Sequence, residues 1–290
     1  MKNLKLIDKK VMSFSINYHN STTTEQTESY VTFGAVNGND YKGNMYNHEA
    51  VTDNTMNNWW TLPLKGLQYN NKNIFKSQVN YAIIDSGTSF IYLPKTDWDA
   101  FNSSISTVEG LSCSTHVKNG ADQYCKSFTK TCDELQDSIG TLAIELESVK
   151  YTIPAKGFLI ENILRAKCVV GISYISDTND MVILGDTFMR NFYISFEYEN
   201  SRVGLAVNKN APYSNIEISL KFGAWYIVAI ICLTLLLIGL LACIIYVCLR
   251  DRLRRRKERK VMRISGPGKS NQGSNGGINK TDYGTFSEKT

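Results

Sequence analysis

The sequence has few of the residues from which metal sites are built. It contains three histidines among 290 residues, His19, His48 and His116, and they lie far apart along the chain. Its seven cysteines form no C-x-x-C pair, whereas zinc sites use cysteine and histidine ligands at short paired spacings. We therefore expect neither a metal ion nor another cofactor.

The chain also has little net charge outside one segment. Charged residues make up 20% of the sequence and the formal net charge is +5. Eight positive and two negative residues fall between Arg250 and Lys260, so the positive excess belongs to this segment. A nucleic acid is therefore not expected as a partner.

A long apolar run is absent from the N-terminus but present near the other end. Residues 1–10 hold no stretch suited to a signal peptide, whereas Phe222 to Leu249 carry no charge at all. At about 1.5 Å per residue this run can cross a hydrocarbon core of about 30 Å, which predicts a transmembrane helix over 222–249 rather than a buried core helix. The basic segment that follows predicts a single-pass type I protein, with residues 1–221 luminal or extracellular and 250–290 cytosolic.

The residues after the apolar run are rich in glycine, serine, asparagine and lysine, which predicts a disordered tail over 250–290. Tyr283 to Phe286 resembles a sorting signal for endosomal or lysosomal delivery. Cys248 lies near enough to the cytosolic face to be a palmitoylation candidate.

Short strands separated by glycine, asparagine and aspartate fill the first part of the chain, which predicts an all-β fold. Met12, Phe14 and Ile16 alternate with polar residues, as in a half-buried strand. Residues 97–106 break the pattern, because their apolar residues have helical spacing, and we expect a short helix there. Asn20 and Asn102 each begin an Asn-x-Ser/Thr sequence and are candidate glycosylation sites.

The stretch from Tyr81 to Pro94 offers one candidate for catalysis. Four residues of strand character lead to Asp85, and Ser86, Gly87, Thr88 and Ser89 follow as a tight turn. The hydroxyl and N–H groups of this turn would stabilise a carboxylate held away from bulk water. An Asx turn that only ends a core strand is the alternative interpretation of these residues.

A second stretch, from Val182 to Ala206, favours the catalytic interpretation. With Asp85 and its turn, it resembles the C-terminal lobe of the pepsin-like aspartic proteases, in which an apolar pair and a glycine, here Ile183-Leu184-Gly185, run beside the loop of the catalytic acid. The resemblance extends from about Lys5 to Val207. It includes the segments 11–16, 30–34, 41–44 and 60–64.

The resemblance implies a C-terminal lobe over residues 1–210, a linker over 211–221, and Asp85 as the second aspartate of a catalytic pair. It implies that Ser86 braces the turn and that Gly87, Thr88 and Ser89 bind the substrate backbone. Ile83, Ile183 and Tyr92 become candidates for pocket walls, although core packing is an equal alternative for each.

Cysteines 113, 125, 132 and 168 precede the apolar run, and the sequence allows three pairings among them. The resemblance implies the pairs Cys132–Cys168 and Cys113–Cys125. Disulfides require an oxidising compartment, the lumen or the cell exterior.

The sequence contains no second D-[ST]-G turn. Since the family forms its site from two lobes that each give one aspartate, we expect a first lobe, absent here, in a longer protein. The expected function is a membrane-anchored aspartic endopeptidase acting on peptides or proteins. Three alternatives stay open: a pepsin-like binding or sorting module without catalysis, a fragment inactive on its own, and two copies that pair their Asp85 residues.

Overall fold

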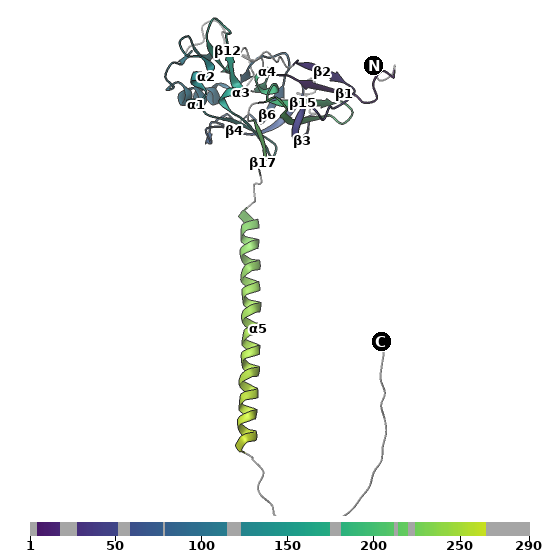
Figure 1. Ribbon diagram of the computed structural model, residues 1–290, viewed down its shortest axis with the longest axis vertical. Helices are drawn as coiled ribbons and strands as arrows, with labels where there is room; N and C mark the ends of the chain where they lie inside the picture. The colour runs from purple at the N-terminus through teal and green to yellow at the C-terminus, as the bar shows by residue number, and fades with distance from the viewer. Residues whose placement is uncertain are drawn as a thin grey trace, which may run out of the picture. The chain divides into compact units, whose positions relative to one another are not determined.

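The computed structural model describes two units separately, within residues 1–221 and 222–290 (Figure 1). The described residues are 5–17, 28–51, 59–77, 79–114, 123–174, 181–211, 214–219 and 224–264. Asn20 and the segment Tyr283 to Phe286, both named above, lie outside them.

Strands dominate the first unit, as the turn-rich sequence predicts. The strands are β1 (Val11–Ser15), β2 (Tyr30–Phe33), β3 (Tyr41–Glu49), β4 (Thr61–Tyr69), β5 (Lys72–Asn73), β6 (Tyr81–Ile84), β7 (Ile91–Tyr92), β8 (Ser112–Cys113), β9 (Gln123–Ser127), β10 (Leu142–Leu146), β11 (Val149–Ile153), β12 (Leu159–Glu161), β13 (Cys168–Tyr174), β14 (Val182–Leu184), β15 (Phe192–Glu197), β16 (Arg202–Asn208) and β17 (Asn215–Ile218). The helices are α1 (Lys95–Ile105), α2 (Cys132–Leu135), α3 (Ala155–Phe158), α4 (Asp186–Met189) and α5 (Ala224–Ile264).

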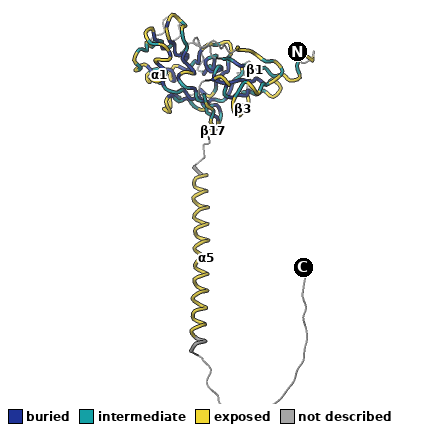
Figure 2. The backbone as a smooth tube through the Cα atoms, in the orientation of Figure 1, coloured by how far each residue is buried: buried dark blue, intermediate teal, exposed yellow. Residues whose placement is uncertain are grey.

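The strands form two sheets around one apolar core (Figure 2). A five-stranded sheet has the order β2-β1-β15-β16-β3. The larger sheet runs β17-β11-β10-β4-β6-β14-β7-β13-β9-β8, with β5 on β4 and β12 on β13. In Figure 2 buried backbone runs through this unit, while residues 226–260 of α5 are exposed.

Strand β1 forms where the alternation predicts it, but its more buried face is the polar one. Ser13 and Ser15 are buried, whereas Met12 and Phe14 are half-buried against the core. β1 lies between β2 and β15, so both of its edges are paired, and the side chains on both of its faces are partly or fully buried. The Ser13 hydroxyl donates to the carbonyl of Ala35 at 2.9 Å, which satisfies its buried polar group.

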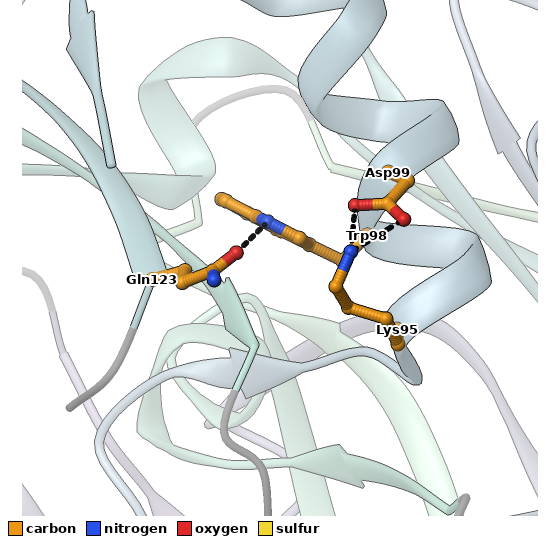
Figure 3. A network of polar contacts seen from close by, with 4 residues as sticks. All are labelled: Lys95, Trp98, Asp99 and Gln123. Atoms are coloured by element: carbon orange, nitrogen blue, oxygen red, sulfur yellow. Dashed lines mark hydrogen bonds and ion pairs between the residues drawn. The ribbon is translucent and has the colours of Figure 1, made fainter. Parts of the chain in front are cut away.

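Helix α1 matches the prediction within two residues at its start and one at its end. Trp98, Phe101 and Ile105 are fully buried, because their spacing puts them on one helix face. Figure 3 shows the Trp98 indole pointing to Gln123 of β9, to which its Nε1–H donates at 3.0 Å. Lys95 and Asp99 pair with each other along the same helix (Figure 3).

Two disulfides lie in the first unit, and they are the pairs that the resemblance implies. Cys113 and Cys125 link β8 to β9, and Cys132 and Cys168 link α2 to β13. The second pair spans 36 residues, so it removes more conformational freedom from the unfolded chain than the first, which spans 12.

The two sheets are also joined by a buried histidine. His48 of β3 lies in the five-stranded sheet and is almost fully buried. Its Nδ1 lies 3.1 Å from a carboxylate oxygen of Glu147, and its Nε2 lies 2.6 Å from the hydroxyl of Tyr151. Glu147 is in the turn between β10 and β11, and Tyr151 is on β11, so this cluster links β3 to the edge of the larger sheet.

Part of the predicted linker over 211–221 is a strand. β17 pairs with β11 in an antiparallel register that places Ile216 opposite Tyr151 and Glu217 opposite Lys150. Ile216 packs against the core, and Lys150 and Glu217 form an ion pair at 3.1 Å. The expectation of a plain linker was wrong here, because only Ile216 and Ile218 alternate with polar residues, too short a pattern to stand out in the sequence.

The helix α5 is longer than the apolar run that predicts it. It has 41 residues and continues through the basic segment to Ile264, so the expected disorder of residues 250–264 is wrong. Arginine, lysine, leucine and glutamate are good helix formers, and the first glycine and proline after Leu249 are Gly266 and Pro267. Within the described residues, α5 is the one helix long and apolar enough to cross a membrane.

Candidate active site

The turn that carries Asp85 lies at the centre of the larger sheet. Strand β6 delivers the residue, and after the turn the chain returns as β7. Strand β14 lies between the two, parallel to β6 and antiparallel to β7. Since β14 comes about a hundred residues later in the chain, the fold brings two distant segments together at Asp85.

Two donors from its own turn hold the Asp85 carboxylate. The Gly87 N–H donates to Oδ1 at 2.9 Å and the Thr88 hydroxyl donates to Oδ2 at 2.5 Å. Asp85 is half-buried rather than buried, because Ser86, Gly87 and Ser89 around it are exposed. The arrangement stabilises a negative charge and leaves the turn accessible.

Gly185 closes the site from behind, where no other residue fits. A Cβ atom at this position would lie 2.2 Å from the carbonyl oxygen of Thr88 and 2.5 Å from that of Phe90. The Gly185 N–H donates to the Phe90 carbonyl at 3.2 Å, and the Asp85 N–H donates to the Leu184 carbonyl at 3.1 Å. The glycine therefore permits the close approach that clamps the turn onto β14.

The short helix α4 continues this clamp immediately after Gly185. The Asp186 N–H donates to the carbonyl of Thr88 at 2.7 Å. Thr187 donates to the Ser89 carbonyl twice, from its N–H at 3.0 Å and from its hydroxyl at 2.9 Å. The exposed turn is thus held at both of its ends by backbone contacts.

Asp186 is the site residue that the sequence analysis missed. Burial raises the pKa of its carboxyl, the charge of Arg190 opposes this shift, and the charge of Asp85 adds to it. Asp186 therefore lies close enough to Asp85 for the charge of Asp85 to act on it. The signal was its position directly after Gly185, since a residue that follows the clamp must lie beside the turn.

The three apolar candidates for pocket walls lie side by side. Ile183 of β14 is opposite Ile83 on β6 and opposite Tyr92 on β7, so the three form one row across neighbouring strands. Ile183 and Tyr92 are half-buried, whereas Ile83 is 4% exposed. Ile83 is therefore packed in the core next to Ile183 and offers little surface.

Two further predictions concern side chains on this unit. Asn102 lies in α1, half-buried, and the serines that follow it are exposed. Glycosylation there stays a prediction. Among the described residues, no group of three or more histidine, cysteine, aspartate or glutamate side chains is placed to hold a metal ion.

Comparison with known protein families shows to which family this chain belongs. The model of the eukaryotic aspartyl protease family matches residues 1–208, which contain Asp85, its turn and the glycine clamp. The chain belongs to the eukaryotic aspartyl protease family. Peptide-bond hydrolysis is thus the chemistry associated with this fold, and the pepsin-like resemblance is confirmed.

Curated aspartyl proteases match only part of their own length. Pepsin A of Suncus murinus is 24% identical over 188 residues, which are 64% of this chain and 43% of the relative. Gastricsin of Callithrix jacchus is 28% identical over 61% of this chain, which is 42% of the gastricsin sequence. Vacuolar protease A of Aspergillus fumigatus is 26% identical over 70% of this chain, which is 46% of the vacuolar protease sequence. The chain thus spans less than half the length of these aspartyl proteases.

Proposed function

We propose that this chain supplies one of the two catalytic aspartates of a membrane-anchored aspartic endopeptidase. The observation that carries the proposal is the Asp85 carboxylate, which accepts from Gly87 and Thr88 in a turn clamped by Gly185. A turn that only ended a strand would need neither the accessible carboxylate nor the close glycine contact.

The mechanism uses a water molecule between two carboxylates that share one proton. Like charges so close cannot both ionise, so one carboxylate is ionised and the other protonated. The ionised member takes a proton from the water while the protonated member donates a hydrogen bond to the scissile carbonyl. The donors from Gly87 and Thr88 stabilise Asp85 whenever it carries the negative charge.

The second aspartate comes from a first lobe, with Ser86 bracing the turn against it. The partial match to full-length relatives supports this proposal. So does β2, an edge strand of the five-stranded sheet on which Tyr30, Val31 and Phe33 are 40%, 41% and 52% exposed. Apolar side chains gathered on an edge strand are typical of a surface that another part of a protein covers.

The peptide substrate lies along the exposed turn, where Gly87, Thr88 and Ser89 contact its backbone. Ile183 and Tyr92 provide apolar surface for its side chains, with Ile83 next to Ile183 in the same row. The half-buried state of Ile183 and Tyr92 supports this role, because a side chain used only for core packing would be fully covered.

The helix α5 anchors the protein in a membrane with residues 1–221 luminal or extracellular. The positive residues that follow Leu249 support this orientation. The two disulfides of the first unit support it independently, since they form in oxidising compartments. Endosomal, lysosomal and cell-surface membranes all meet these requirements.

The test is Asp85→Asn in this chain joined to its first lobe. Because the variant removes one member of the acid–base pair, peptide turnover at acidic pH should fall at least about a hundredfold. Asp99→Asn is the matched control, since Asp99 is exposed on α1 and paired with Lys95. Unchanged turnover in Asp85→Asn would end the catalytic assignment. Peptide binding without turnover in the parent protein would favour a binding module.

A further inference from the structure

The continuation of α5 beyond Leu249 orders the basic segment. A flexible tail would spread its positive charges over many arrangements, whereas a helix fixes each side chain relative to the others. Residues 250–260 are exposed throughout. Their charges therefore form a fixed pattern on the surface of the helix.

The pattern has two unlike sides. Arg252, Arg256, Arg259 and Lys260 are separated by four, seven and eight residues from the first, which places them on one helix face without an acidic residue. We call these four residues the cationic face. Asp251 and Glu258 are also seven residues apart and lie on the opposite side of the helix.

The acidic residues are spaced to pair with cations that are not part of the cationic face. Arg254 and Glu258 form an intrahelical ion pair at 3.7 Å, and Arg255 is four residues after Asp251, the spacing of a second such pair. The charge of the cationic face is therefore left for an external anion.

The length of the cationic face along the helix axis favours one class of anionic lipid over another. From Arg252 to Lys260 the helix rises about 12 Å, at about 1.5 Å per residue. Electrostatic interactions in salt of physiological concentration are largely screened beyond about 8 Å. In a membrane of singly charged lipids, all the negative charges lie in one plane. Such a membrane would attract Arg252 but would act only weakly on Lys260.

We propose that the cationic face binds a phosphoinositide headgroup with several phosphates, in the leaflet next to the C-terminal end of the membrane helix. Such a headgroup carries phosphates both near the lipid surface and further from it, and so matches cations stacked along the helix axis. Arginine suits this ligand, because its planar guanidinium binds phosphate oxygens in pairs. The inference rests on the proposed membrane span and is independent of proteolysis.

The test uses the full chain in phosphatidylcholine nanodiscs that contain phosphatidylinositol bisphosphate or, separately, phosphatidylserine. Bound lipids are counted by native mass spectrometry as each lipid is titrated. Two variants each lose four positive charges from the same segment. The face variant is Arg252→Gln, Arg256→Gln, Arg259→Gln and Lys260→Gln, and the control variant is Arg250→Gln, Arg254→Gln, Arg255→Gln and Lys257→Gln.

The parent chain should bind the bisphosphate lipid at least about tenfold more tightly than phosphatidylserine, and the face variant should lose at least that factor. The control variant should stay within about threefold of the parent. Equal losses in both variants would show attraction by net charge alone and overturn the inference, as would equal binding of the two lipids or no loss in the face variant. A chain that does not enter nanodiscs would overturn the membrane span and the inference together.

Discussion

A side chain at position 185 would collide with the carbonyl oxygens of Thr88 and Phe90. For this reason Gly185→Ala should lower the free energy of unfolding by at least about 2 kcal/mol, since the clamped turn has no space in which to shift. Thermal denaturation of the chain measures the effect. Gly38→Ala is the control, because a Cβ at Gly38 meets no atom within 4 Å. Equal midpoints for the two variants would contradict the clamp.

At the same scale, the sequence predicts the candidate site better than its surroundings. Asp85, its turn and Gly185 form short continuous motifs, so their chemistry can be read locally. Asp186 was missed because the sequence shows no such turn around it. Its proximity to Asp85 depends on strand β14, which only the folded chain brings beside β6.

His48 makes the link between the two sheets sensitive to pH. Burial lowers the pKa of its imidazole, and the hydrogen bond and charge of Glu147 oppose that shift in part. The unfolded chain therefore takes up a proton more readily than the folded chain below about pH 6.5. The stabilisation from neutral His48 is present above this pH and is lost as the pH falls through the range between the two pKa values.

We expect the free energy of unfolding of the full chain in micelles to decrease from pH 7 to pH 5. In His48→Gln this slope should be smaller, although the variant should be about 1–3 kcal/mol less stable at pH 7 because Tyr151 and Glu147 lose a partner. Denaturant titrations followed by tryptophan fluorescence measure both effects. An unchanged slope in the variant would show that a group other than His48 causes the pH dependence. The lowered pKa of Glu197 acts only at more acidic pH, below about 4.5.

Strand β17 should protect the edge of the larger sheet from solvent. Ile216→Asp places a charge where the strand packs on the core, so amides of β11 should exchange with solvent about fivefold faster or more. Hydrogen exchange with mass spectrometry measures this, with β15 as the internal reference. Ile218→Asp is the matched control, because Ile218 is 56% exposed. Equal acceleration in both variants would show that β17 does not hold this edge.

Elements with strong local patterns are those that the sequence predicts well. The three apolar residues of α1 mark one helix face, and the apolar run marks α5. The sequence does not predict β17, which forms because β11 offers a free edge, or the end of α5, which is decided by helix propensity after the apolar pattern stops. The buried serines of β1 were missed as well, because residue type alone places the apolar Met12 and Phe14, and not the serines, on the buried face.

For the whole molecule we predict that residues 1–221 alone do not cleave peptides. Without the aspartate of a first lobe, Asp85 cannot be both the base that takes a proton from water and the acid that polarises the carbonyl. Purified residues 1–221 should therefore show no pepstatin-sensitive turnover between about pH 3 and 7, and activity should appear when a first lobe is joined to them. Turnover by the isolated ectodomain that is lost in Asp85→Asn would favour two copies that pair their aspartates.

The pairing of β17 with β11 also bears on how the ectodomain that we propose, residues 1–221, would be released from a membrane. A cut after Ile218 would leave the strand in place and free a lobe with that edge closed. A cut before Asn215 would remove it, expose the backbone N–H and C=O groups of β11, and offer them to any other extended chain. Of two cleavages only a few residues apart, the one after Ile218 would thus release a soluble product and the one before Asn215 a product that tends to aggregate.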